Sequence, residues 1–128
     1  MANFQCDHFH LRSLDPDGSA RFYERMFGAQ RLGTEDNAGK RRVVIALGGV
    51  KLFIEEVPPG THAAPEPPYL GLEHIGLAVS GIDAVVTELK NKGAEFVVEP
   101  RSPRPGIRIA FIRGPENVRI ELIERSAT

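Results

Sequence analysis

An internal duplication constrains the fold of this chain more than any other feature of its sequence. Three landmarks occur twice, in the same order and about 66 residues apart. They are Asp7-His8 and Glu73-His74, Gly28-Ala29 and Gly93-Ala94, and Val50-Lys51-Leu52 and Val118-Arg119-Ile120. Because chance matches would not keep one order and one spacing, we interpret the chain as two copies of one structural unit.

Each half is expected to hold one strand, one helix and three further strands. The pattern of apolar and polar residues predicts strands at residues 5–13, 29–33, 41–47 and 50–57, and again at 73–80, 94–99, 107–113 and 118–124. The order β-α-β-β-β, found twice, predicts an α+β fold with helices outside mostly antiparallel sheet.

The helices have local signals of their own. Asp15 is a favourable N-cap, Pro16 suits the first helical position, and Gly28 ends the first helix. The second helix is expected over residues 82–92, where apolar residues recur at helical spacing.

The whole chain, residues 1–128, is predicted to be one domain made of two repeats. The first repeat covers residues 4–57, a linker covers 58–71, and the second repeat covers 72–125. Five of the ten prolines lie in the linker, which makes it a stiff connection.

The charge balance excludes some classes of partner. With 16 basic and 17 acidic residues the net charge is −1, so we expect neither nucleic acid nor a membrane surface as a partner. The single cysteine, Cys6, cannot form an internal disulfide and favours a reducing compartment. The sequence has no targeting segment and no membrane-spanning run, so a cytoplasmic protein is expected.

Three residues are candidates for a metal site. His8 and His74 occupy the same position in the first strand of each repeat, and pairing of duplicated units would bring them near one another. Glu121 lies in the middle of the last strand, where a carboxylate is costly unless it is paired or coordinated. Two imidazoles and one carboxylate form a ligand set that leaves metal positions open for a substrate.

These residues resemble the vicinal oxygen chelate superfamily, which contains glyoxalase I, methylmalonyl-CoA epimerase, fosfomycin resistance enzymes, bleomycin resistance proteins and extradiol dioxygenases. The resemblance covers nearly the whole chain. It rests on Asp7-His8, Asp15, Phe22-Tyr23 and Gly28-Ala29, then on Glu73-His74-Ile75, Lys92-Gly93-Ala94 and the run from Gly114 to Glu124. It implies two repeats that form curved mixed sheets around a central cavity.

The resemblance also implies a ligand set. His8, His74 and Glu121 fall where the family holds a divalent ion, which could be zinc, nickel, cobalt, manganese or iron. A fourth ligand, Glu or Gln, lies in some members on the last strand of the first repeat. Alignment without gaps places Phe53 there, whereas a register shift or bulge would bring in Glu55. Both alternatives remain open from the sequence.

The implied chemistry is stabilisation of an enolate or oxyanion by the metal, with Glu121 or Glu55 moving a proton. Candidate substrate-binding residues are His10, which shares the face of His8, and Phe53, at the possible fourth ligand position. Arg104 and Arg108, in a loop rich in proline and arginine, could hold an anion.

The leading function is therefore a metal-dependent lyase or isomerase of a small oxygenated metabolite. An extradiol-type dioxygenase with a two-His-one-Glu site is one alternative, and a metal-free binding or resistance protein is another. A homodimer is expected in each case, because the open sheets of this family generally close against a partner chain.

Overall fold

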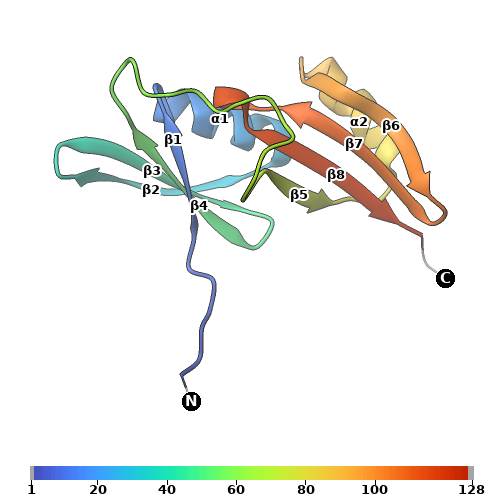
Figure 1. The fold of residues 1–128 in the computed structure, drawn as a ribbon, viewed down its shortest axis with the longest axis horizontal. Helices are drawn as coiled ribbons and strands as arrows, with labels where there is room; N and C mark the ends of the chain where they lie inside the picture. Colours follow the sequence, from blue (N-terminus) through green and yellow to red (C-terminus); the bar gives the residue numbers. More distant parts are fainter. Residues whose placement is uncertain (1, 127–128) are drawn as a thin grey trace. The chain divides into compact units, whose positions relative to one another are not determined.

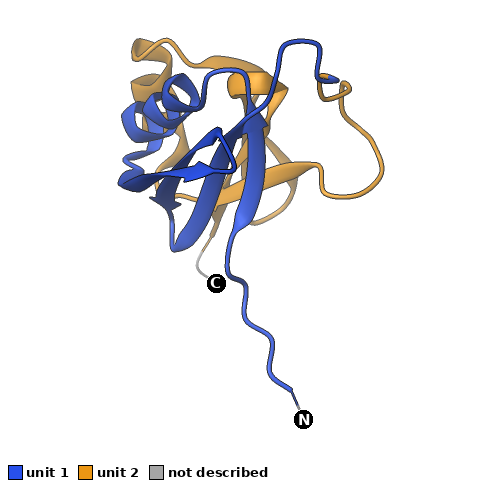
Figure 2. Cartoon of the chain, turned by 90° about the vertical axis from the view of Figure 1, so that its left-hand side faces the viewer, with its two compact units in different colours: residues 1–62 blue, residues 63–128 orange. Residues whose placement is uncertain are grey.

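The duplication in the sequence corresponds to a duplication in the computed structural model, which describes residues 2–126. The chain divides into two compact units, residues 1–62 and 63–128 (Figure 2). The boundary falls inside the proline-rich linker, so each unit contains one repeat.

The first unit has the order β-α-β-β-β (Figure 1). Its elements are β1 (Phe9–Ser13), α1 (Pro16–Phe27), β2 (Gln30–Asn37), β3 (Lys40–Leu47) and β4 (Val50–Glu56). The four strands form a sheet in the order β1-β4-β3-β2, in which β1 runs parallel to β4 and the other neighbours are antiparallel.

The second unit repeats this topology. Its elements are β5 (His74–Ala78), α2 (Ile82–Asn91), β6 (Glu95–Arg104), β7 (Ile107–Arg113), a short 3-10 turn (Pro115–Asn117) and β8 (Arg119–Arg125). The strand order is β5-β8-β7-β6, again with the first strand parallel to the last. The predicted α+β class with two β-α-β-β-β repeats and mixed sheets is confirmed.

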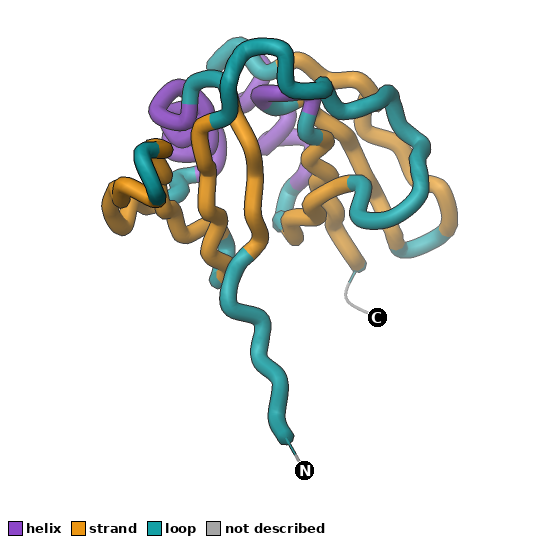
Figure 3. Tube along the Cα trace, turned by 60° about the vertical axis from the view of Figure 1, so that its left-hand side comes forward, coloured by secondary structure: helices purple, strands orange, loops and turns teal. Residues whose placement is uncertain are grey.

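In each unit the helix covers one face of the sheet (Figure 3). The residues that pack there are apolar and almost fully buried: Ala20, Tyr23, Val43, Ile45, Leu52 and Ile54 in the first unit, and Ile82, Val86, Leu89, Ile112, Ile120 and Leu122 in the second. Since side chains alternate along a strand, the polar residues between them lie on the opposite face. That face carries the candidate site residues.

The caps of the two helices differ. The Asp15 side chain accepts a hydrogen bond from the Gly18 amide at the start of α1, and Gly28 closes that helix in the left-handed conformation, as predicted. Gly81 precedes α2 and has no side chain to cap it. Glu124 of β8 supplies the cap instead, accepting from the amides of Gly81 and Ile82 at 2.6 and 3.1 Å.

Three predicted strand limits were wrong. β2 continues to Asn37 instead of ending at residue 33, because its ladder with β3 extends to the Asn37–Lys40 pair. β1 begins at Phe9, so His8 lies one residue before the strand, because the ladder with β4 starts at the Phe9–Leu52 pair. The segment predicted as a loop after residue 100 is the second half of β6. Pro100 and Pro103 fit there because β6 is an edge strand with repeated register shifts, where a missing N–H is tolerated.

Candidate functional site

In the second unit the structure brings His74 and Glu121 together. His74 opens β5, and Glu121 lies in the middle of the adjacent strand β8 on the sheet face away from α2. The His74 Nε2 atom is 3.3 Å from the Glu121 Oε1 atom. An imidazole nitrogen and a carboxylate oxygen at this separation are two of the donors that a divalent metal requires.

Neighbouring groups fix the orientation of the His74 ring. Its Nδ1 atom is 2.9 Å from the carboxylate of Glu73, the preceding residue, and the Phe111 ring packs edge-on with its centre 5.2 Å away. A histidine that ligates a metal commonly donates its other N–H to a carboxylate in this way, which sets the tautomer. Nε2 is therefore the nitrogen directed at Glu121.

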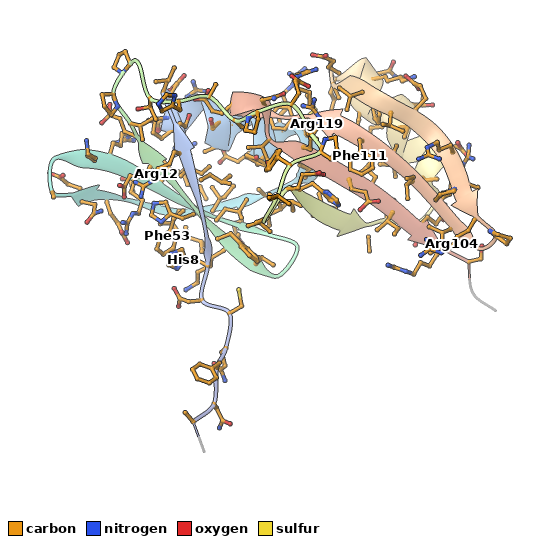
Figure 4. The ribbon with its side chains drawn as sticks, viewed as in Figure 1. His8, Arg12, Phe53, Arg104, Phe111 and Arg119 are labelled. Carbon is orange, nitrogen blue, oxygen red and sulfur yellow. The ribbon has the colours of Figure 1, made fainter. Side chains whose placement is uncertain are left out.

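His8 has the same arrangement in the first unit. Its Nδ1 atom is 2.7 Å from the carboxylate of Asp7, and this hydrogen bond holds the pKa of Asp7 below its ordinary value. The His8 ring stacks on the Phe53 ring, with centres 3.8 Å apart and planes nearly parallel (Figure 4). Both candidate ligand histidines thus have an acidic residue directly before them that holds Nδ1.

The strand register places Phe53 at the position equivalent to Glu121. His10 pairs with Phe53 in the first sheet as Gly76 pairs with Glu121 in the second. The β1–β4 ladder continues in one register as far as Ser13 and Glu56, so Glu55 lies two residues beyond the position equivalent to Glu121.

Glu55 is instead the centre of an ionic network. It is 4% exposed and accepts hydrogen bonds from Asn37, Arg42 and Arg12. These donors, with Asn37 contributing most, lower the pKa of Glu55 to about 2. A carboxylate with so low a pKa is a weak base, and both of its oxygens already accept hydrogen bonds, which speaks against Glu55 as the acceptor of a substrate proton.

His10 lies next to this network, with Nε2 3.6 Å from Glu55. Partial burial and the nearby Arg12 guanidinium lower the pKa of His10. Its ring meets the Phe53 ring edge-on at 6.0 Å, so His10, Phe53 and His8 share one sheet face.

The two arginines predicted to bind an anion are not near the His74–Glu121 pair. Arg108 faces the helix side of its sheet, where Nη2 and Nε bind the Asp83 carboxylate at 2.8 and 3.2 Å. Arg104 lies at the far end of β6, beside the hairpin turn (Figure 4). Sequence proximity placed these arginines together, but alternation along strands directs them to different surroundings.

The structure reveals a pocket that the sequence did not predict. A hollow of about 360 Å³ opens in the second unit beside His74, lined by Pro67, Pro68, Glu73, Val97, Val98, Phe111 and Arg119. Arg119 precedes Glu121 by two residues and therefore shares its face, which was a usable signal. The contribution of Phe111 and Val98 follows only from the strand pairings.

The candidate metal ligands are divided between the two units. Within residues 2–126, no group of three or more His, Cys, Asp or Glu residues lies together in metal-binding geometry. The His74–Glu121 pair supplies two donors of the predicted set, and His8 belongs to the other unit. Two imidazoles and a carboxylate fit a divalent metal by donor chemistry.

No helix in the described part of the chain is both long enough and apolar enough to cross a membrane.

Comparison with known proteins identifies relatives over almost the full length. A sequence model of the family described as Glyoxalase/Bleomycin resistance protein/Dioxygenase superfamily matches residues 5–122. A protein of Synechocystis sp. named "Probable lactoylglutathione lyase" is 30% identical over 124 residues, covering 94% of this chain and 95% of that protein.

Solved structures share the fold. A glyoxylase/bleomycin resistance protein/dioxygenase domain from Frankia sp. EAN1pec has a TM-score of 0.80 at 22% identity, covering 98% of this chain and 94% of that one. A mutant of the fosfomycin resistance protein FosX from Listeria monocytogenes, complexed with Mn(II) and 1S,2S-dihydroxypropylphosphonic acid, has a TM-score of 0.74 at 19% identity, covering 99% and 95%.

Proposed function

We propose that this chain, which belongs to the Glyoxalase/Bleomycin resistance protein/Dioxygenase superfamily, is a metal-dependent lyase or isomerase of a small oxygenated metabolite. One observation carries the proposal. In both repeats an acidic residue holds Nδ1 of the following histidine, Asp7 for His8 and Glu73 for His74. Polar exposed histidines need no such partner, whereas metal ligands are commonly oriented by one.

The metal would be held by His8, His74 and Glu121. This set suits first-row divalent ions such as zinc, nickel, cobalt, manganese or iron. The FosX relative binds Mn(II), which supports a divalent ion here as well. When bound, the ion would polarise substrate oxygens and stabilise the negative charge that develops on them.

The residues around the ion have separate roles in this proposal. Glu73 and Asp7 hold the ligand imidazoles in one tautomer. Glu121 has His74 as its ion-pair partner among the described residues, so it is better placed than Glu55 to accept a substrate proton. Phe111 provides an apolar wall beside His74, which helps to exclude water.

Metal analysis of protein purified without added metal tests the proposal. We expect about one divalent ion per chain in the wild type and in His62→Ala, which changes an exposed linker histidine. His74→Ala and Glu121→Gln are expected to lose the ion. A wild type with no metal above background would contradict the proposal and favour a metal-free binding protein. The first reaction to assay is that of lactoylglutathione lyase, because a relative 30% identical carries that name.

An extradiol-type dioxygenase is the second candidate, and the position of Phe53 favours it. Phenylalanine at the position equivalent to Glu121 leaves three donors, two imidazoles and one carboxylate, which is the set that non-haem iron oxygenases use. Iron in the purified protein, together with oxygen consumption on a catechol, would favour this candidate. Manganese, nickel, cobalt or zinc would favour the lyase or isomerase.

A further inference from the structure

Arg119 lines the pocket of the second unit, within reach of a bound substrate. It is 7% exposed, lines the pocket beside His74, and lies opposite His74 in the β5–β8 ladder. Two residues further along β8, Glu121 faces the same side of the sheet. Arg119 therefore shares a sheet face with the candidate ligands His74 and Glu121, and it lines the hollow together with the acidic residue Glu73.

The carboxylate that now pairs with Arg119 comes from the linker. The Glu66 Oε2 atom accepts from Arg119 Nη2 at 2.8 Å, and Asn117 and Arg113 contact the other Glu66 oxygen at 3.4 and 3.5 Å. The Glu66 side chain is 71% exposed, although its partner is buried. Removing the counter-ion of a buried arginine strongly destabilises the folded protein. An exposed glutamate that leaves such an ion pair gains hydration in exchange.

Apart from Glu73, whose carboxylate is bound to His74 Nδ1, the remaining wall of the pocket is apolar. Pro67 and Pro68 follow Glu66 directly, and Val97, Val98 and Phe111 lie on the sheet side. The Tyr69 hydroxyl donates to the Glu73 carbonyl at 3.0 Å and so ties this part of the linker to the start of β5. At about 30 Å³ per water-sized group, the hollow holds about twelve such groups, which is the size of a small metabolite.

We propose that Arg119 is the anion-recognition residue of the site, and that Glu66 occupies it until a substrate carboxylate takes its place. The substrate class is then a small monocarboxylate with a short apolar chain whose other oxygens reach the metal. A planar carboxylate is favoured because Arg119 already binds one there. The reaction assigned to such a substrate rests on the proposed function, but the binding step does not.

Nuclear magnetic resonance of the metal-free protein tests the binding step, with sodium butyrate as the probe and butyramide as its uncharged match. We expect butyrate to shift the Arg119 Nε–Hε signal and the amide signals of Phe111 and Val98, and butyramide to leave them unchanged. Acetate should bind more weakly, by about two- to fourfold for each methylene it lacks.

Variants of Glu66 and Arg119 distinguish an anion-binding site from an ion pair with a purely structural role. Glu66→Gln removes the competing carboxylate and should tighten butyrate binding about two- to fivefold. Arg119→Gln should weaken binding about tenfold or more, and Arg119→Lys should weaken it less because the charge remains. The matched controls are Glu99→Gln, another exposed ion-paired glutamate, and Arg125→Gln, an exposed arginine on the same strand.

Equal binding of butyramide, or a Glu66→Gln variant that binds butyrate no better than wild type, would overturn the proposal. Because Glu66 lies on the surface, that variant remains informative even if Arg119→Gln fails to fold. Butyrate binding in a protein that takes up no metal would sustain the anion site while removing the proposed function.

Discussion

At the scale of single residues, the most informative contacts are those that orient His8 and His74. In each case a neighbouring carboxylate holds Nδ1, at 2.7 Å from Asp7 and at 2.9 Å from Glu73. The repeat made the two histidines recognisable in the sequence, but the role of the preceding acids appeared only with side-chain geometry. Asp7 and Glu73 lie before the first residues of β1 and β5, so alternation along a strand does not predict their contacts with the histidines.

Replacement of Glu73 by Gln should weaken metal binding about tenfold, because the amide keeps the shape of the side chain but loses the charge that supports the His74 imidazole. Competition with a chelating dye measures the affinity. Glu99→Gln, which removes a charge from the surface pair with Lys90, is the control and should leave the affinity unchanged. Equal affinity in Glu73→Gln and wild type would show that Glu73 does not orient a ligand.

Phe53 offers a gain-of-function test. Since it stands at the position equivalent to Glu121, Phe53→Glu would add a carboxylate at the place where the family resemblance implies a fourth ligand. We expect metal binding to tighten by about tenfold, equivalent to about 1.4 kcal/mol. Phe53→Leu removes the ring stacked on His8 without adding a donor, and it should not tighten binding. If both variants bind metal alike, position 53 is not adjacent to the metal.

At the scale of helices and strands, one ion pair is duplicated. Asp17 in the first turn of α1 binds Arg41 of β3 at 2.6 and 2.9 Å, and Asp83 in the first turn of α2 binds Arg108 of β7. A carboxylate in the first helical turn also interacts favourably with the helix dipole. The duplication indicates that Arg108 fastens a helix to its sheet, which explains why it does not face the candidate site.

The ion pair between Asp17 and Arg41 predicts that the stability of the protein depends on pH. Hydrogen bonds from Arg41 and Arg31 lower the pKa of Asp17 from 3.8 to about 2. Because the folded-state value is the lower one, the stabilisation is present above pH 3.8 and is lost as the pH falls through about 2.

The expected contribution of Asp17 is about 1 kcal/mol, since solvent screens the half-exposed Arg41. Urea unfolding of wild type and Asp17→Asn between pH 2 and 7 measures the difference in the free energy of unfolding. That difference should shrink toward pH 2; a constant difference would mean that the Asp17 charge does not stabilise α1.

The cap of α2 gives a second test at this scale. Glu124→Ala removes the acceptor for the Gly81 and Ile82 amides and should lower the Tm by roughly 2–4 °C. Glu56→Ala is the matched control, since Glu56 holds the equivalent position on β4 while Asp15 caps α1. Thermal unfolding followed by circular dichroism compares the two. A larger loss in Glu56→Ala would contradict the assignment of the cap.

At the scale of the whole molecule, exposed leucines favour self-association. Leu70 and Leu72 are 100% and 76% exposed, in the segment that leads into β5. Large apolar side chains exposed together are typical of an interaction surface. We predict that the protein is a homodimer and that the double variant Leu70→Glu, Leu72→Glu is a monomer.

Size-exclusion chromatography with light scattering measures the two masses. Leu32→Glu, at an exposed leucine in the first unit, is the control and should remain dimeric. A monomeric wild type at high protein concentration would contradict the prediction, and a dimeric double variant would place the interface elsewhere.

The amino-acid sequence by itself determined the duplication, the β-α-β-β-β order, the limits of α1 and the three candidate metal ligands. Each follows from a local signal, such as alternation along a strand, a capping side chain or a repeated motif. These signals can be recognised without knowing which distant residues are in contact. For that reason the resemblance to the family was visible in the sequence, and it is confirmed.

Only the tertiary structure decided the position equivalent to Glu121, the network around Glu55 and the pocket beside Arg119. All three depend on the register between strands distant in sequence, which hydrogen-bond ladders and packing of the buried face select together. A shift of two residues would keep every apolar side chain on its face, so the sequence pattern alone does not distinguish Phe53 from Glu55. The hydrogen-bond ladder between β1 and β4 distinguishes the two, because it places Phe53 opposite His10.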